Sequence, residues 1–360
     1  MNQTEEDERA EQMNQTERTI NENSETKVAN GEGDSKSWYE LKESRSAIGY
    51  SLMLFMLRFF PPFLMRLLTF PIGFGYYVFS PAARKFSKEY FSILSAFVKK
   101  QSGKNFKGNT FFHLISFALA LVEMTQTLAG KFSFEKNVFW QNDDVKDLVE
   151  KIDNSKGAIL LISHLGNAQM LRGLAGENQA GTKRQMQITS ISDVKITAGF
   201  NALLRKINPE LFSSFTSINT DEIGPETIFV LQDKLEKGEI IVIAGDRVSA
   251  VTDRNISIPF LGKTASFPYG VFLLIALLDF PTYFVFGTRQ KDVSVKPRYD
   301  MFVVKNKISF KADEKNGSEE IGKKERAKRI IQTAESFARE LEKHCVDHPY
   351  QWYNFYDFWK

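Results

Sequence analysis

The residue best suited to acid–base chemistry is His164, which follows an apolar run. The stretch ILLISHLGNAQ, residues 159–169, predicts a buried strand, a tight turn at Gly166 and Asn167, and the start of a helix. Such a turn directs the imidazole over the edge of a sheet, where helix N–H groups point to the same place. This arrangement suits a general base beside a substrate that develops negative charge. The alternative is a histidine that only stabilises a loop.

A second polar group follows another apolar run. Asp246 and Arg247 come soon after the strand predicted at residues 239–244, and Arg254 lies a little further along. A carboxylate and two arginines near a strand end can bind a phosphate or orient a reacting group. A salt-bridged surface loop is the other interpretation.

The elements that would position these residues alternate along the second half of the chain. Apolar or β-branched runs predict strands, and amphipathic periodicity predicts helices between them. This alternation is typical of an α/β protein with its site at the strand ends. The predicted strands are 157–163, 185–191, 239–244, 282–287 and 301–310, and the predicted helices are 110–135, 168–176, 197–206, 225–236, 268–279 and 318–346.

Residues 45–85 form a strongly apolar segment that is interrupted by prolines and by Arg58 and Arg66. A simple spanning helix needs about 20 unbroken apolar residues. We therefore predict a helical segment that associates with a membrane, with both arginines extended to lipid headgroups. A buried helical hairpin of a soluble domain is the alternative.

Charge is unevenly distributed along the chain. Residues 1–36 contain ten acidic and four basic residues, a net charge of −6, so the rest of the chain carries +9 for an overall +3. We predict a disordered acidic tail at 1–36 and a folded α/β domain over 86–360. The basic body fits phospholipid headgroups or an acidic carrier protein, whereas no nucleic-acid-binding motif is present. Cys345 is the only cysteine, which excludes disulfides and thiolate metal clusters.

Several motifs occur in the order of one known family. The chain resembles the lysophospholipid acyltransferase superfamily and, within it, the bacterial lipid A late (lauroyl or myristoyl) acyltransferases and the predicted lipopolysaccharide acyltransferase group. The resemblance covers residues 45–359. It depends on the broken apolar segment, SHLGN (163–167), AGDR (244–247), PFLG (259–262), FPTYFVF (280–286) and PYQWYNFYDFW (349–359).

The resemblance implies a fold, a location and a reaction. The fold is a mixed central β-sheet flanked by helices, held on the cytoplasmic face of the cell inner membrane by the N-terminal segment. The reaction moves a fatty acyl chain from a thioester of acyl carrier protein or coenzyme A to a hydroxyl or amine of an envelope lipid. His164 would remove the acceptor's proton during attack on the thioester, with no acyl-enzyme, no metal and no other cofactor.

The family motif His-x4-Asp/Glu is altered here, because Gln169 occupies the acidic position. A carboxylate fixes the imidazole tautomer and stabilises the imidazolium, and glutamine offers no charge. Three interpretations follow. Gln169 orients His164 in a working enzyme; or Asp246 or Asp193 supplies the charge; or the site is inactive and the protein binds lipid or a carrier protein.

The residues expected to contact substrate are Asn167, Lys195, Arg247 and Arg254. Lys195 is the candidate for a basic residue that relatives carry in this part of the chain. The aromatic tail at 349–359 is expected to pack over the sheet near the site rather than to enter a membrane interface. A lipid hydrolase is disfavoured because the Gly-x-Ser-x-Gly motif is absent from the sequence.

Overall fold

A computed structural model describes most of the compact unit formed by residues 52–360. The described residues are 55–359 without 168–169, 172–181, 184–185, 193–204, 207, 210–212, 221–222, 248–253 and 312–320. The acidic tail predicted at 1–36 lies outside the described residues. Most residues of the helices predicted at 168–176 and 197–206 lie outside them as well. The predicted boundary between residues 85 and 86 falls within a helix, α4 (Pro81–Ser102).

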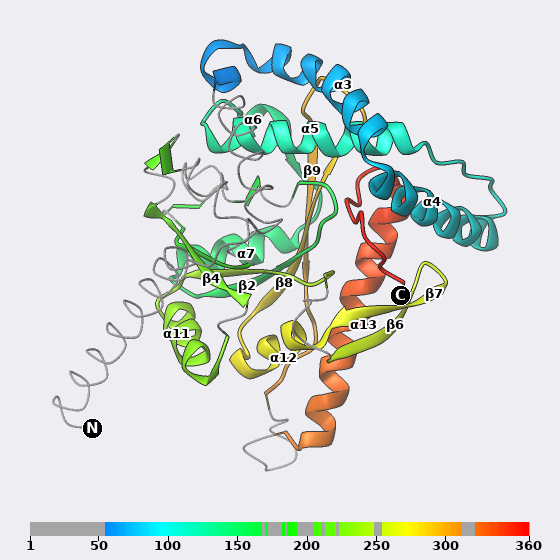
Figure 1. Cartoon of the computed structure of the whole chain (residues 1–360). Helices are drawn as coiled ribbons and strands as arrows, with labels where there is room; N and C mark the ends of the chain where they lie inside the picture. The colour runs from blue at the N-terminus through cyan, green and yellow to red at the C-terminus, as the bar shows by residue number, and fades with distance from the viewer. Residues whose placement is uncertain are drawn as a thin grey trace, which may run out of the picture. The chain divides into compact units, whose positions relative to one another are not determined.

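The described chain folds around a mixed seven-stranded sheet with the order β1-β9-β8-β2-β5-β3-β4 (Figure 1). Strands β8, β2, β5, β3 and β4 run parallel to one another, β9 is antiparallel to β8, and β1 is parallel to β9. The predicted α/β class with a mixed sheet is therefore confirmed. The strands are β1 (Val138–Trp140), β2 (Ala158–Ile162), β3 (Ile188–Ser192), β4 (Phe215–Asn219), β5 (Ile240–Ala244), β8 (Thr282–Arg289) and β9 (Tyr299–Lys305).

Helices and a separate hairpin cover the two faces of this sheet. One face packs against α11 (Pro225–Glu236), α12 (Tyr269–Leu278), α13 (Lys323–Asp347) and the hairpin of β6 (Asn255–Phe260) and β7 (Lys263–Pro268). The other packs against α7 (Asp144–Asp153) and the short α6 (Phe134–Asn137).

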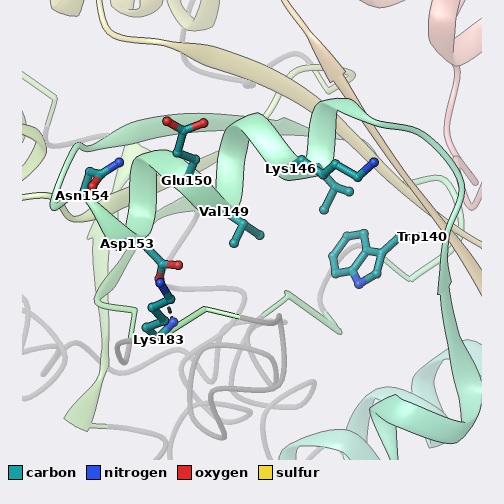
Figure 2. A pocket seen from close by; sticks show the side chains of 8 residues that line it. Trp140, Lys146, Val149, Glu150, Asp153, Asn154 and Lys183 are labelled. Atoms are coloured by element: carbon teal, nitrogen blue, oxygen red, sulfur yellow. Dashed lines mark hydrogen bonds between the residues drawn. The ribbon is translucent and has the colours of Figure 1, made fainter.

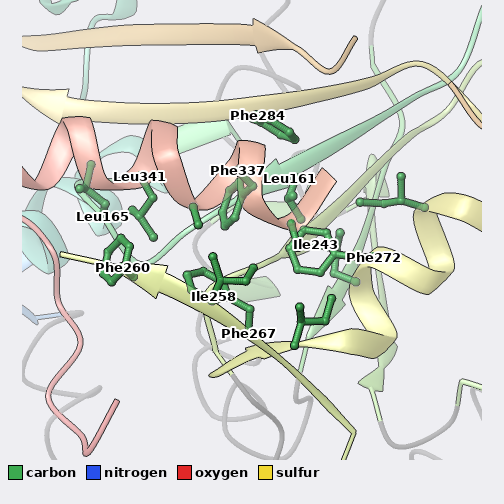
Figure 3. Packing of buried hydrophobic residues seen from close by; sticks show 14 of the residues in the cluster. Leu161, Leu165, Ile243, Ile258, Phe260, Phe267, Phe272, Phe284, Phe337 and Leu341 are labelled. Atoms are coloured by element: carbon green, nitrogen blue, oxygen red, sulfur yellow. The ribbon is translucent and has the colours of Figure 1, made fainter. Parts of the chain in front are cut away.

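Every residue of β2 is apolar because the strand is buried on both faces of the sheet. Ile159 and Leu161 face the first layer, while Leu160 and Ile162 face the second. A parallel strand in the middle of a sheet is buried on both faces and is therefore apolar throughout. Figure 3 shows Leu161 and its neighbours from β5 and β8 packed against Phe337 of α13.

Helix α3 (Pro62–Phe79) packs on α5 (Thr110–Leu128), and α4 leaves α3 at a bend of 94°. Arg66 is only 9% exposed; its Nε donates to the Val295 carbonyl (2.8 Å) and its Nη1 to Gln126 Oε1 (2.6 Å). The prediction that Arg66 extends to headgroups is wrong, because its guanidinium instead ties α3 to α5 and to the β8–β9 connection.

The outer face of α3 is nevertheless apolar and exposed. Of the described helices, only α5 is alone long and apolar enough to cross a membrane, and 61% of that stretch is buried inside the protein. Helices α3 and α4 pass the same test only as a bent pair. The exposed apolar residues from residue 55 to the end of α3 are Phe55, Phe59, Phe63, Leu67, Ile72, Phe74, Tyr76, Val78 and Phe79.

Candidate active site

The register of two parallel strands brings His164 and Asp246 together. Strand β2 pairs with β5 so that Ile162 lies opposite Ala244, the last residue of each strand. His164 and Asp246 each follow two residues later, so both emerge at the same edge of the sheet. The edge at which these parallel strands end is where α/β proteins commonly place a binding or catalytic site.

His164 and Asp246 form a hydrogen-bonded dyad. His164 Nδ1 lies 2.8 Å from Asp246 Oδ1, and the His164 backbone N–H donates to Oδ2 at 2.8 Å. Because a carboxylate accepts, Nδ1 carries the proton and Nε2 keeps a lone pair. Asp246 is fully buried, whereas 34% of the His164 side chain is exposed. Among the described residues none hydrogen-bonds to Nε2, so this nitrogen is available to take a proton from a substrate.

The surroundings of Asp246 keep it ionised. Burial alone would raise its pKa, but the electrostatic attraction of the His164 imidazole and the hydrogen bonds from His164 and Trp352 hold the pKa below its usual value. A buried anion bonded to Nδ1 stabilises the imidazolium that forms when Nε2 accepts a proton.

The loop that carries His164 is fixed from both sides. Gly166 has a left-handed φ of +65°, its N–H donates to the Gln351 carbonyl (2.7 Å), and a Cβ there would collide with the backbone of Gly287. The backbone N–H groups of residues 164–167 all donate within the protein. These four N–H groups are therefore not available to donate to an oxyanion of the substrate.

The C-terminal aromatic tail packs against the dyad and the loop that carries His164. Trp352 is 1% exposed, pairs with Leu165 in an isolated β-bridge, and donates its indole N–H to Asp246 Oδ2 at 3.0 Å. The Tyr353 N–H donates to the His164 carbonyl at 2.9 Å. The prediction that this tail packs near the site is confirmed, but its hydrogen bond to the carboxylate has no signature in the sequence.

His113 of α5 holds the tail in turn, and the sequence did not predict this role because no motif marks the residue. Its Nε2 lies 3.0 Å from the Trp352 carbonyl and its Nδ1 lies 2.9 Å from Ser87 Oγ. A carbonyl only accepts, so Nε2 carries the proton and the Ser87 hydroxyl donates to Nδ1. Burial lowers the pKa of His113 to about 4, so the ring is neutral.

The remaining predicted residues divide into three groups. Arg247 is exposed beside the dyad, with its guanidinium 5.3 Å from the centre of the Tyr356 ring, and Arg254 is exposed at the start of β6. Asn167 is buried, and its Nδ2 donates to the Ala120 carbonyl at 3.1 Å, so it faces α5 rather than open space. Gln169, Asp193 and Lys195 lie outside the described residues.

A cavity of about 440 Å³ lies beside α7 (Figure 2). Trp140, Val149 and Asp153 line it, together with Lys183, whose backbone N–H donates to Asp153 Oδ1 at 2.7 Å. None of its lining residues contacts His164 or Asp246, so the cavity and the dyad are separate features.

Comparison with known proteins gives no family for the chain: no protein-family model matches it, and no curated protein sequence matches it significantly. Within the described residues, no three His, Cys, Asp or Glu side chains gather as a metal site would require.

Proposed function

We propose that the protein transfers a fatty acyl group from a thioester, carried by acyl carrier protein or coenzyme A, to a hydroxyl or amine of an envelope lipid such as a lipid A precursor. The observation that supports this most directly is the 2.8 Å contact between His164 Nδ1 and the buried Asp246 carboxylate. Asp246 supplies the negative charge that Gln169 cannot, which favours a working enzyme over an inactive relative.

The reaction follows from the orientation of the dyad. His164 Nε2 accepts the proton of the acceptor hydroxyl while the acceptor oxygen attacks the thioester carbonyl carbon. The carbon–sulfur bond then breaks, and the leaving thiolate takes the proton from Nε2 to become a thiol. Asp246 stabilises the imidazolium between these steps, and the protein forms no covalent intermediate. Arg247, exposed next to Asp246, is suited to bind a phosphate of either substrate.

The apolar outer face of α3 fits an enzyme that works on lipids. Its exposed phenylalanines would enter the headgroup region of a membrane while its other face stays packed on α5. We therefore propose a protein bound to the cytoplasmic face of the inner membrane through one helix face, where a lipid acceptor is within reach of the dyad.

The test is acyl transfer by purified protein in detergent. The protein is incubated with acyl carrier protein or coenzyme A thioesters and the total lipid extract of its host, and products are followed by mass spectrometry. We expect a new acylated lipid that is absent with His164→Ala and formed about 10⁴-fold more slowly with Asp246→Asn, the loss seen when a comparable triad carboxylate becomes an amide.

Two other outcomes contradict the proposal. Release of free fatty acid with no acylated lipid would make the protein a thioester or lipid hydrolase in which His164 activates water. No product from the wild type with any donor would favour a binding protein. Circular dichroism of Asp246→Asn, an isosteric change, shows whether a lost activity reflects the site or the fold.

A further inference from the structure

Five exposed lysines gather where α4 ends, and we call them the lysine cluster. Two lie on the last turn of α4, two on the loop from α4 to α5, and one at the turn of the β6–β7 hairpin. The residues are Lys99, Lys100, Lys104, Lys107 and Lys263.

Packing brings these three segments together. The loop folds back on α4, because Ser95 Oγ donates to the Phe106 carbonyl at 2.6 Å and the Phe91 and Phe106 ring centres are 5.9 Å apart. The hairpin turn lies against the same helix, since a Cβ added at Gly262 would be 3.3 Å from the Phe97 ring. Lysines from separate parts of the sequence therefore share one surface.

No described residue neutralises the positive charge of the cluster. No acidic residue occurs between Glu89 and Glu123, and none of the five lysines forms an ion pair with another described residue. Glu342 of α13 lies near the hairpin, but its Oε2 accepts the Leu261 N–H at 2.5 Å. Such a surface attracts a partner with complementary negative charge and speeds its association.

Aromatic rings connect the lysine-bearing segments to the tail that contacts the dyad. Phe106 on the lysine-bearing loop lies 6.3 Å from Tyr350 of the tail. Tyr90 of α4 and Phe260 of the hairpin lie 5.3 and 5.2 Å from Trp352, which donates to Asp246. Along α4, Tyr90 and Lys99 are separated by about 13 Å at 1.5 Å per residue.

The position of the cluster distinguishes it from a lipid-binding surface. It lies at the end of α4 away from α3, beyond a bend of 94°, and beside the β6–β7 hairpin (Figure 1). The cations next to the apolar face of α3 are instead Arg84, Lys85 and Lys88, in the first turns of α4. Arg84 donates to the Tyr77 and Val78 carbonyls, whereas Lys85 and Lys88 are exposed. Lys85 and Lys88 are therefore the cations suited to headgroups, and the cluster at the other end of α4 suits a partner in solution.

We propose that the lysine cluster docks an acidic carrier protein whose arm presents the acyl thioester to His164. The proposal builds on the proposed acyl transfer and assigns its donor. It predicts that binding of the carrier depends on the cluster and on ionic strength, whereas use of a coenzyme A thioester does not.

The test is titration of the full chain with an acidic acyl carrier protein bearing a palmitoyl thioester, followed by calorimetry. The variant K99E/K100E/K104E/K107E/K263E is compared with K136E/K156E/K311E/K323E/K324E, which changes the net charge equally at exposed lysines elsewhere. We expect the cluster variant to bind the carrier at least tenfold more weakly and the control variant to bind within threefold of the wild type. Binding by the wild type should weaken when salt is raised.

Other results overturn the docking. The docking proposal is wrong if the wild type does not bind the carrier, or if both variants lose affinity for the carrier equally. It is also wrong if the cluster variant loses only its binding to phosphatidylglycerol vesicles, which would make the cluster a lipid-binding surface. Because binding is measured without turnover, the two proposals fail separately. Lysine-dependent binding with no acyl transfer contradicts the enzyme, and transfer with lysine-independent binding contradicts the docking.

Discussion

At the scale of single residues, the site depends on a contact that sequence spacing does not reveal. Asp246 is far from His164 along the chain, yet it lies beside it because β2 and β5 are neighbours that end in register. Both residues were candidates from the sequence, since each follows an apolar run. Their pairing was one of several alternatives, because nothing in a single sequence states which strands are adjacent.

The first prediction concerns Gln169. If Asp246 supplies the charge in the dyad, Gln169→Glu should change kcat for acyl transfer by less than about threefold, because a second carboxylate adds little to an imidazole that is already oriented. Asp246→Asn is the matched comparison. A rise of a hundredfold or more with Gln169→Glu would show that Asp246 is not the partner that activates His164.

The second prediction concerns Trp352 as a positioning residue. Trp352→Phe keeps an aromatic ring in the core but removes the N–H that donates to Asp246 at 3.0 Å. A hydrogen bond to a charged group contributes about 1.5–3 kcal/mol, so kcat should fall about tenfold to a hundredfold. The pH at which kcat falls on the acid side should also change, whereas a loss of structure alone would lower kcat without changing that pH. If both kcat and its pH profile are unchanged, Trp352 does not position the dyad.

At the scale of elements, the sequence predicted long periodic segments well and short or edge elements poorly. Helix 225–236 and the cores of strands β2 and β5 match the structure because their residues face one environment over several turns or pairs. Strand β4, helix α7 and the β6–β7 hairpin were not predicted. Strand β4 obtains its stability from tertiary neighbours, which local periodicity does not report. Helix α7 and strand β6 do carry apolar residues at helical and at alternating spacing, so both elements could have been predicted from the sequence.

The third prediction is a loss of stability in acid that arises from two buried histidines. Burial lowers the pKa of His113 to about 4 and that of His344 to about 3, against 6.5 for the unfolded chain. The unfolded chain therefore binds protons first as the pH falls. Stability should decrease from about pH 6.5 down to pH 4 for His113, and further to pH 3 for His344, by about 1.4 kcal/mol per pH unit for each histidine.

Urea unfolding at a series of pH values measures this slope. His113→Gln keeps a donor for the Trp352 carbonyl but cannot titrate, so its stability should depend less on pH between 6.5 and 4 than that of the wild type. Parallel curves for the two proteins would mean that His113 does not contribute to the acid sensitivity.

At the scale of the whole molecule, the features of different function are arranged on different surfaces. The apolar outer face of α3, the one-third-exposed His164 and the lysine cluster belong to separate elements. An enzyme that joins a lipid acceptor to a donor from solution needs this separation, because the two substrates must reach one histidine without competing for one surface.

The fourth prediction tests the lipid-facing side of this arrangement. Phe59, Phe63 and Phe79 are 64%, 62% and 85% exposed, and each ring that leaves water contributes about 1.5 kcal/mol, or roughly tenfold in affinity. The variant F59S/F63S/F79S should therefore sediment with phospholipid vesicles at least a hundredfold less strongly than the wild type. The control I223S/F229S/I331S removes exposed apolar residues from other elements and should bind as the wild type does. Equal binding by all three proteins would mean that the outer face of α3 does not contact the membrane, and the apolar surface would then require a protein partner instead.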